Sequence, residues 1–505
     1  MRERLKRVAW KAARVKALGG SNPPLSAILQ LRMKTQKERL GPCLIGLGVL
    51  LFYAAFPSYF HNFDGVACAI AVDLGDFRHL FHGNHLLYGF LGFIFHRALN
   101  LIGLTLNGLW ALQWMDMILG AAGAGYMHLL LRRQGFSPRI SAGASVGMAL
   151  SFGYWMSALE AQVYIAGAFC LLIAFEESLR KKPDPTRLAL KHAAAMLIHG
   201  SNALFAPAAL YALYRASEET SERKKSAFLY LAVSTSVVLI AYFLVGAIVM
   251  RPQSWQDLRI WLGGTAALGP DRTLNWHGGT LGSDLSNWIR LCGLVISPSW
   301  LLALPAWSLA GWAVWKNRRA PSPPVRIALI FFIPYALFFS RWESNTLHFR
   351  VNDLIPLWFL AAYAAGELGK PNRRAYAVLA YAAVLAAFNL SGGILKISDP
   401  AANKKLQEAR WIGRSTPEGA WVAADGIEEV YVPYFGHRKP LILRFVGSSP
   451  EAMSERIFSL MAKGDSVFVT SERLNNHSGF PRGLGLREVS RENKLILYQI
   501  TSIAQ

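Results

Sequence analysis

The sequence predicts a polytopic α-helical membrane protein of about eleven crossings, with a small α/β domain at its C-terminal end. Of its 505 residues, 53% are hydrophobic and only 17% are charged, whereas soluble domains carry about 25% charged residues. The apolar residues form repeated runs of about 20 residues, the length that a helix needs to cross a hydrocarbon core. After Leu395 these runs end, and helical and extended patterns alternate.

The first 40 residues are strongly basic. They hold eleven Lys and Arg against two Glu, in a chain whose net charge is +22. This basic stretch is too long for a cleaved signal peptide, which measures about 15–30 residues in total. We therefore expect residues 1–40 to be a cytoplasmic arm that acts as a topology signal or contacts anionic lipid. The other basic residues are spread over short loops, so nucleic-acid binding is not expected.

Short basic loops orient the remaining spans, because Lys and Arg in such loops stay in the cytoplasm. The basic loops are residues 132–139, 180–187, 215–225, 316–326 and 370–374. If all are cytoplasmic, an even number of crossings separates each loop from the next. Crossings at 42–60 and 108–131 then leave residues 61–107 as an outer loop, whose apolar part is expected to lie as helices along the outer surface.

Residues 188–214 are flanked by basic loops but are too short for two complete crossings. Their middle is the polar sequence HGSN at His199–Asn202. We expect two half-crossing helices that meet at this break. Irregular backbone at membrane depth persists only where protein or a water-filled cavity satisfies its hydrogen bonds. The sequence therefore predicts a polar cavity beside the break.

Three regions follow from this layout: the basic arm (1–40), a membrane domain (41–395) and, by the parity of the crossings, an outer α/β domain (396–505). Further crossings are expected at residues 139–179, 226–249, 291–315, 327–340, 354–369 and 375–393. In the outer domain the patterns predict helices at 403–416 and 450–464, and strands at 421–426, 429–435, 465–472 and 494–500.

The expected outer face gathers ionisable residues from the ends of different spans. They are Asp64, Glu160, His199, Arg341, Glu343, His348 and Arg350. Such groups near membrane depth are costly and usually face a cavity or a partner. A carboxylate can take a proton or hold a metal, and Arg suits phosphate oxygens. Plainer interpretations stay open, because Asp64 suits a helix N-cap and Arg350 could reach to lipid headgroups.

The layout resembles the GT-C glycosyltransferases, and within them the protein O-mannosyltransferase and aminoarabinose-transferase type with its bacterial relatives. The resemblance covers residues 41–395 in layout, and the outer C-terminal domain also fits. It rests on an acid after the first span and two short patterns: Asp64, the run Asn84-His85-Leu86-Leu87-Tyr88, and Trp155, Glu160 and Tyr164.

This resemblance implies transfer of a sugar from a polyprenyl-phosphate-linked donor to a lipid, protein or glycan acceptor, with inversion. The reaction would take place on the outer side of a bacterial inner (cytoplasmic) membrane. By analogy Asp64 is the general base, and Glu160 helps to position the acceptor or the base. The substrate-binding candidates are His85, His199, Arg341, His348 and Arg350, of which Arg341, His348 and Arg350 match the donor-phosphate ligands.

The chain departs from the family pattern at two places. Gly65 follows Asp64 where many relatives have a second acid, and Leu86-Leu87 replaces a Pro-Pro turn after His85. No dedicated metal site or cofactor is predicted, because the four cysteines are scattered and no zinc motif is present. A divalent cation held by Asp64 and Glu160 remains an option. A transporter or flippase of a lipid-linked intermediate is the alternative function, although such transporters often repeat a broken helix and this chain shows one break.

Overall fold

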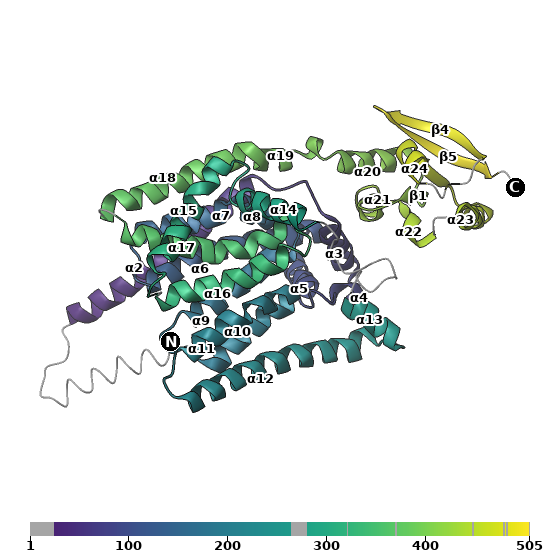
Figure 1. Ribbon diagram of the computed structural model, residues 1–505. Helices are drawn as coiled ribbons and strands as arrows, with labels where there is room; N and C mark the ends of the chain where they lie inside the picture. The colour runs from purple at the N-terminus through teal and green to yellow at the C-terminus, as the bar shows by residue number, and fades with distance from the viewer. Residues whose placement is uncertain are drawn as a thin grey trace, which may run out of the picture.

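The computed structural model describes residues 25–263, 280–320, 322–368, 371–446, 449–477, 480 and 483–503. It confirms a mostly helical chain with a small C-terminal α/β domain, which lies beyond one end of a helical bundle (Figure 1). The first 24 residues of the predicted basic arm lie outside the described residues.

The bundle is built from helices of very different lengths. They are α2 (Leu25–Ala55), α3 (Phe63–Leu74), α4 (Phe77–Leu80), α5 (Tyr88–Leu101), α6 (Gly108–Arg133), α7 (Pro138–Leu150), α8 (Phe152–Leu159), α9 (Val163–Ser178), α10 (Pro185–Ile198), α11 (Ala206–Tyr214), α12 (Thr220–Val245), α13 (Trp255–Gly263), α14 (Leu281–Leu294), α15 (Trp300–Lys316), α16 (Pro323–Phe339), α17 (Leu354–Glu367), α18 (Pro371–Asn389) and α19 (Leu395–Ile397). In Figure 1, α18 and α19 run along the bundle and lead into the C-terminal domain.

Among the described residues, two helices are long and apolar enough to cross a membrane alone, Thr220–Met250 and Arg373–Ile397. A third span results if the pair α8 and α9, bent by 119°, is counted as one. The predicted count of about eleven crossings is therefore unconfirmed. The 26-residue helix α6 is not among these spans, and it carries the buried polar residues Gln113, Asp116 and His128.

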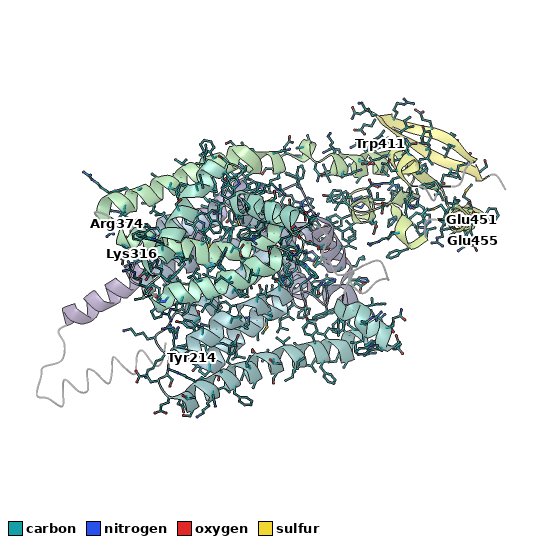
Figure 2. The ribbon with its side chains drawn as sticks, viewed as in Figure 1. Tyr214, Lys316, Arg374, Trp411, Glu451 and Glu455 are labelled. Carbon is teal, nitrogen blue, oxygen red and sulfur yellow. The ribbon has the colours of Figure 1, made fainter. Side chains whose placement is uncertain are left out.

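The basic loops meet at one end of the bundle. Lys316 Nζ lies 2.7 Å from Glu367 Oε2, and Arg139 lies 4.8 Å from the centroid of the Tyr376 ring. Figure 2 places Tyr214, Lys316 and Arg374 at this end, and the C-terminal domain at the other. Positive charge therefore collects on the side away from the C-terminal domain.

The predicted outer loop folds into the three helices α3, α4 and α5. Asn62 caps α3, with its Oδ1 accepting a hydrogen bond of 2.6 Å from the Gly65 amide, and Gly75 ends the helix in a left-handed conformation (φ 66°). Asp76 caps the short α4 in the same way. Local capping thus divides an apolar stretch into short helices.

The broken helix predicted at residues 188–214 is present. α10 ends at His199, a 3₁₀ turn spans Gly200–Phe205, and α11 follows. The Gly200 amide donates to Asn84 O at 2.9 Å, so the loop before α5 supplies a hydrogen-bond acceptor for the backbone at the break. The break and the outer loop are therefore one structural unit.

The C-terminal domain contains a five-stranded sheet with order β2-β1-β3-β5-β4. β1 pairs in parallel with β2 and β3, and β5 pairs antiparallel with β3 and β4. Its elements are α20 (Lys404–Ser415), β1 (Trp421–Ala424), α21 (Glu428–Phe435), β2 (Lys439–Ile442), α22 (Leu443–Val446), α23 (Pro450–Ala462), β3 (Val467–Thr470), α24 (Ser471–Asn476), β4 (Leu484–Glu492) and β5 (Leu495–Ile503).

The strand predicted at residues 429–435 is wrong, because this segment is the helix α21. The sequence EVYVPYF is rich in valine and aromatic residues, which favours a strand. However, the residues that pack against α3 and α20 recur at helical spacing: Ile427, Val430, Tyr431, Tyr434 and Phe435. Burial of this face against α3 stabilises the helix over a strand.

We predict that the basic end and the C-terminal domain lie on opposite sides of the membrane. In a background without the four native cysteines, Tyr214→Cys and Lys316→Cys mark one end, and Glu451→Cys and Glu455→Cys mark the other (Figure 2). In sealed vesicles of one orientation, a membrane-impermeant maleimide is expected to label only one pair before detergent is added. Labelling of both pairs from the same side would contradict the arrangement.

Candidate functional site

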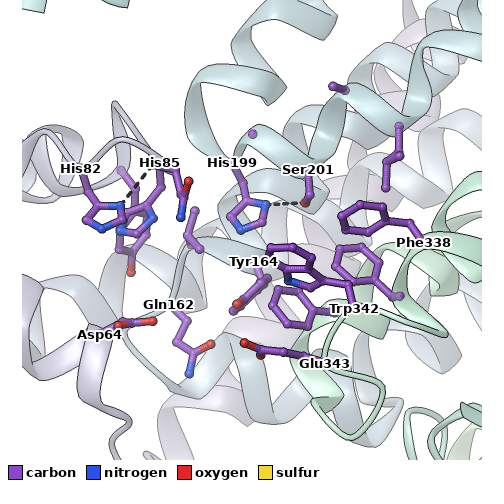
Figure 3. A pocket seen from close by; sticks show the side chains of 18 of the residues that line it. Asp64, His82, His85, Gln162, Tyr164, His199, Ser201, Phe338, Trp342 and Glu343 are labelled. Carbon is purple, nitrogen blue, oxygen red and sulfur yellow. Dashed lines mark hydrogen bonds between the residues drawn. The ribbon is translucent and has the colours of Figure 1, made fainter. Parts of the chain in front are cut away.

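A cavity of about 590 Å³ lies where α3, the loop before α5, the helix break and the end of α16 meet (Figure 3). One wall is polar and carries Asp64, His82, His85 and His199. The opposite wall is mostly aromatic, with Phe338, Phe339, Trp342 and Phe349 among its residues, and Glu343 lies beside Trp342 in the lining. The polar cavity expected beside the break is therefore present, and it joins an acid to an apolar surface.

Asp64 lies in the first turn of α3 and faces the cavity. It is not the N-cap that the sequence allowed, because Asn62 fills that role. The carboxylate is accessible through the cavity, yet the surrounding protein desolvates it and raises its pKa, while a charge on His82 would lower it. Asp64 is therefore a carboxylate with increased affinity for a proton.

Gly65 allows the first turn of α3 to approach the turn at residues 160–162 very closely. A Cβ at position 65 would lie 2.5 Å from the backbone oxygen of Ala161, which is closer than side chains tolerate. The glycine that follows Asp64, where many relatives have an acid, is thus explained by packing.

A buried polar layer lies behind Asp64. Glu160 Oε2 accepts hydrogen bonds from Gln162 Nε2 at 2.9 Å and from Asn62 Nδ2 at 3.5 Å. His348 Nε2 is 3.7 Å from the same oxygen, and its Nδ1 is 3.0 Å from Ser157 Oγ. Glu160 and His348 are therefore partners of each other beneath the cavity and do not line it.

Asp116 of α6 supports this layer, and our sequence analysis missed it. Its Oδ2 accepts from the Gln162 amide at 2.9 Å and from Tyr88 Oη at 2.6 Å, and the residue is completely buried. The signal was an acid inside an apolar helix, which is rare enough to indicate a structural or functional partner.

The histidines of the polar wall are packed in pairs with aromatic rings. The rings of His82 and His85 stack with centroids 4.2 Å apart, and the ring of Tyr164 lies 5.3 Å from His199. His199 Nδ1 also contacts Ser201 Oγ (Figure 3). Burial lowers the pKa of His82, and it lowers the pKa of His85 further. At neutral pH these two rings are neutral hydrogen-bonding groups.

The two candidate arginines lie outside the described lining of the cavity. Arg341 Nη1 is 2.8 Å from Asp284 Oδ2. Arg350 is 1% exposed and lies 2.6 Å from Asp353 Oδ2. Both guanidinium groups are occupied by carboxylates in this structure.

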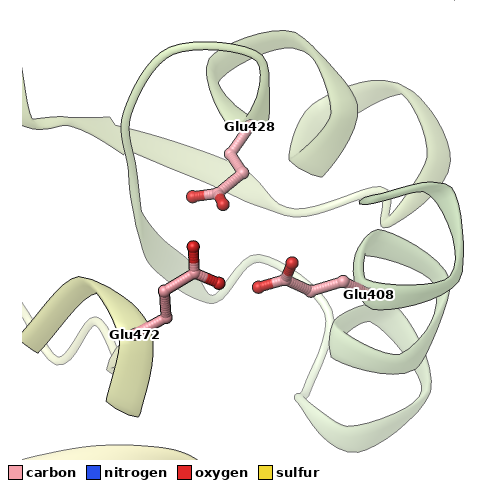
Figure 4. Close-up of side chains that lie close together, drawn as sticks. All are labelled: Glu408, Glu428 and Glu472. Carbon is pink, nitrogen blue, oxygen red and sulfur yellow. The ribbon is translucent and has the colours of Figure 1, made fainter. Parts of the chain in front are cut away.

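One group of acidic residues in the described chain has the spacing of a metal site, and it lies in the C-terminal domain. It consists of Glu408, Glu428 and Glu472 (Figure 4). Lys405 Nζ lies 2.9, 2.7 and 3.1 Å from their oxygens. Burial would lower the pKa of Lys405, but its hydrogen bonds to Glu428 and Glu408 raise it overall. The ammonium group is thus already bound to all three carboxylates, and Arg473 also pairs with Glu428, so the cluster does not fit a metal ion as well.

No family model and no curated protein matches this chain. Among solved structures, ArnT from Cupriavidus metallidurans bound to undecaprenyl phosphate matches with a TM-score of 0.63 and 14% identity, over 91% of this chain and 97% of ArnT. The Archaeoglobus fulgidus oligosaccharyltransferase in complex with Zn and sulfate matches with a TM-score of 0.52 and 14% identity, over 88% of this chain and 70% of that chain.

At this level of identity the comparisons establish the fold. Both solved proteins are GT-C glycosyltransferases, the superfamily that the sequence layout resembles. The ArnT match includes nearly the whole of both chains and therefore extends through the C-terminal domain. The chain has the fold of the GT-C membrane glycosyltransferases.

Proposed function

We propose that this protein transfers a sugar from a polyprenyl-phosphate-linked donor to an acceptor at the outer face of the membrane. The observation that carries the proposal is the position of Asp64 in a cavity with one polar and one aromatic wall. The fold supports it, because ArnT of the same fold has been solved with undecaprenyl phosphate bound.

The proposed reaction is a single displacement. Asp64 accepts the proton of the acceptor nucleophile while that nucleophile bonds to the anomeric carbon. The bond from this carbon to the phosphate oxygen breaks, and polyprenyl phosphate leaves with the electron pair. Displacement from the opposite face inverts the anomeric configuration. The increased proton affinity of Asp64 suits a general base.

The two walls suggest how the donor is held. His85 and His199 can donate N–H groups to phosphate oxygens, and the aromatic wall at the end of α16 can cover an apolar chain. Arg341, His348 and Arg350 are proposed as further phosphate ligands. For this role His348 would have to leave Glu160 and move into the cavity. Arg341 and Arg350 would first have to leave Asp284 and Asp353, so donor binding would rearrange the loop after α16.

Glu160 is proposed to position the base. Its carboxylate holds the side chain of Asn62, which caps the helix of Asp64, and that of Gln162. Because these donors already use its Oε2, the geometry explains a positioning role without a metal. No step of the proposed reaction requires a divalent cation.

We expect Asp64→Asn to abolish transfer while the donor still binds. The experiment measures polyprenyl-phosphate release from a panel of polyprenyl-phosphate sugars, with the protein in lipid discs and membranes as the acceptor source. Loss of the base should reduce kcat by about 10²–10⁴-fold. The matched control is Asp76→Asn, which alters an exposed helix cap in the same outer loop.

Equal release by wild type and Asp64→Asn would remove Asp64 from the chemistry and direct attention to Glu160. Donor binding without release, in the presence of membranes that supply acceptor, would favour a transporter or flippase.

The pH dependence should report the raised pKa of Asp64. The base acts only when deprotonated, so kcat falls as the pH drops through its pKa. Because desolvation raises this pKa, the acid limb of the kcat profile should have its midpoint above the ordinary aspartate value of 3.8. A midpoint at or below 3.8 would show that another group governs the limb.

Gly65→Ala should damage the site through packing alone. The added Cβ would meet Ala161 O at 2.5 Å and displace the first turn of α3. Misplacement of about 1 Å can cost as much as 10²-fold in rate, so we expect kcat to fall about 10- to 100-fold and the melting temperature to decrease. Gly48→Ala, where nothing lies within 4 Å of the added Cβ, should be neutral or stabilising. The same small effect at both positions would contradict the close approach.

A further inference from the structure

The helix α21 of the C-terminal domain contacts the catalytic region. α21 packs against α3, the helix that carries Asp64, and the two share an apolar core that includes Val66 and Val430. Phe63, the residue before Asp64, lies on the edge of this core. Two tyrosines of α21 add polar contacts to the apolar ones.

Tyr431 holds the backbone just before α3. Its hydroxyl donates to His61 O at 2.7 Å and accepts from the His61 amide at 3.2 Å. It also accepts from Asn403 Nδ2 at 3.2 Å, and the ring is 2% exposed. One side chain thus satisfies both backbone groups of a residue that directly precedes the α3 cap, Asn62.

Tyr434 holds the other end of α3. Its hydroxyl donates to Asp73 Oδ2 at 3.1 Å and accepts from the Leu109 amide at 3.1 Å. Asp73 Oδ1 accepts from the Gly108 amide at 2.6 Å, so the same carboxylate joins α3 to the start of α6. Because residues three apart lie on one face of a helix, a single face of α21 reaches both ends of α3.

A third contact links α21 to the first turn of α3. Arg444 of α22 lies 2.6 Å from Glu429 Oε2 of α21, and its guanidinium is 5.7 Å from the centroid of the Phe63 ring. Together these contacts restrain the first and last turns of the twelve-residue α3.

We infer that α21 of the C-terminal domain positions the catalytic helix, with Tyr431 and Tyr434 as positioning residues for Asp64. The inference rests on the proposed function, and it assigns the C-terminal domain an indirect part in the reaction, through the position of Asp64. Tyr431 acts through His61 and the Asn62 cap, and Tyr434 acts through Asp73. Neither lines the cavity among the residues that the structure describes.

The test uses the full chain in lipid discs with the polyprenyl-phosphate sugar that wild type accepts. Tyr431→Phe removes only the hydroxyl that holds His61. It should lower kcat about tenfold or more while the KM for the donor stays within about twofold, because Asp64 moves while His85 and His199, which are proposed to hold the donor, stay in place. Tyr498→Phe is the matched control, since Tyr498 packs within the C-terminal domain away from α3.

Two further readouts distinguish positioning from general stability. Amide exchange in the first turn of α3 should be faster in Tyr431→Phe than in wild type or Tyr498→Phe. Tyr431 is inferred to act through Asn62. The kcat of the double variant Tyr431→Phe/Asn62→Ala should therefore be little lower than the kcat of the less active single variant.

Unchanged kcat in Tyr431→Phe would overturn the inference, and so would a loss confined to the yield of folded protein. If the fold-loss of kcat in the double variant equals the product of the two single losses, Tyr431 does not act through Asn62. If wild type releases polyprenyl phosphate from no donor in the panel, the proposed function fails first. If wild type is active and Tyr431→Phe is equally active, the inference alone fails.

Discussion

The contact between the first turn of α3 and the turn at residues 160–162 is the constraint on which the site depends. It brings the backbone at Gly65 so close to Ala161 O that no side chain fits between them. The same contact places Asn62 beside Glu160, and through Gln162 it connects α3 to Asp116 in the middle of the bundle. Asp64 faces the cavity because its neighbours on both sides are held in this way.

Buried polar groups carry this arrangement across several helices. Asp116 and Glu160 are almost fully buried, and a buried carboxylate is costly unless hydrogen bonds satisfy it. Each is met by donors from other segments, including Tyr88 and Gln162. Removing one donor would leave a charge or lone pair without a partner, so the layer tolerates few geometries. A rigid layer behind Asp64 favours a defined position for its carboxylate.

The ionisable groups of the site fall into two sets, one on the cavity wall and one in the arginine–aspartate pairs beside it. The described cavity wall combines a carboxylate with histidines, and burial keeps His82 and His85 neutral near pH 7. The guanidinium groups of Arg341 and Arg350 are paired nearby with Asp284 and Asp353. A phosphate that enters would compete with those carboxylates, and its binding energy would be offset by the cost of separating each pair. Under the proposed function, binding of the donor phosphate would therefore rearrange the loop that carries both arginines.

The sequence by itself determined the features that arise from local patterns. Apolar runs and basic loops indicated a helical membrane protein, and HGSN indicated the break. Asp64 and His199 were selected by their places in that layout, and His85 by the resemblance to the GT-C glycosyltransferases. The tertiary structure decided the features that depend on distant contacts. Only it identifies Asp116 as the support of the turn before α9, and only it makes residues 429–435 a helix. The hydrogen bond from Tyr431 to His61 joins residues 370 positions apart. Such pairs leave no periodic signal in the chain, because they form only after both helices have packed.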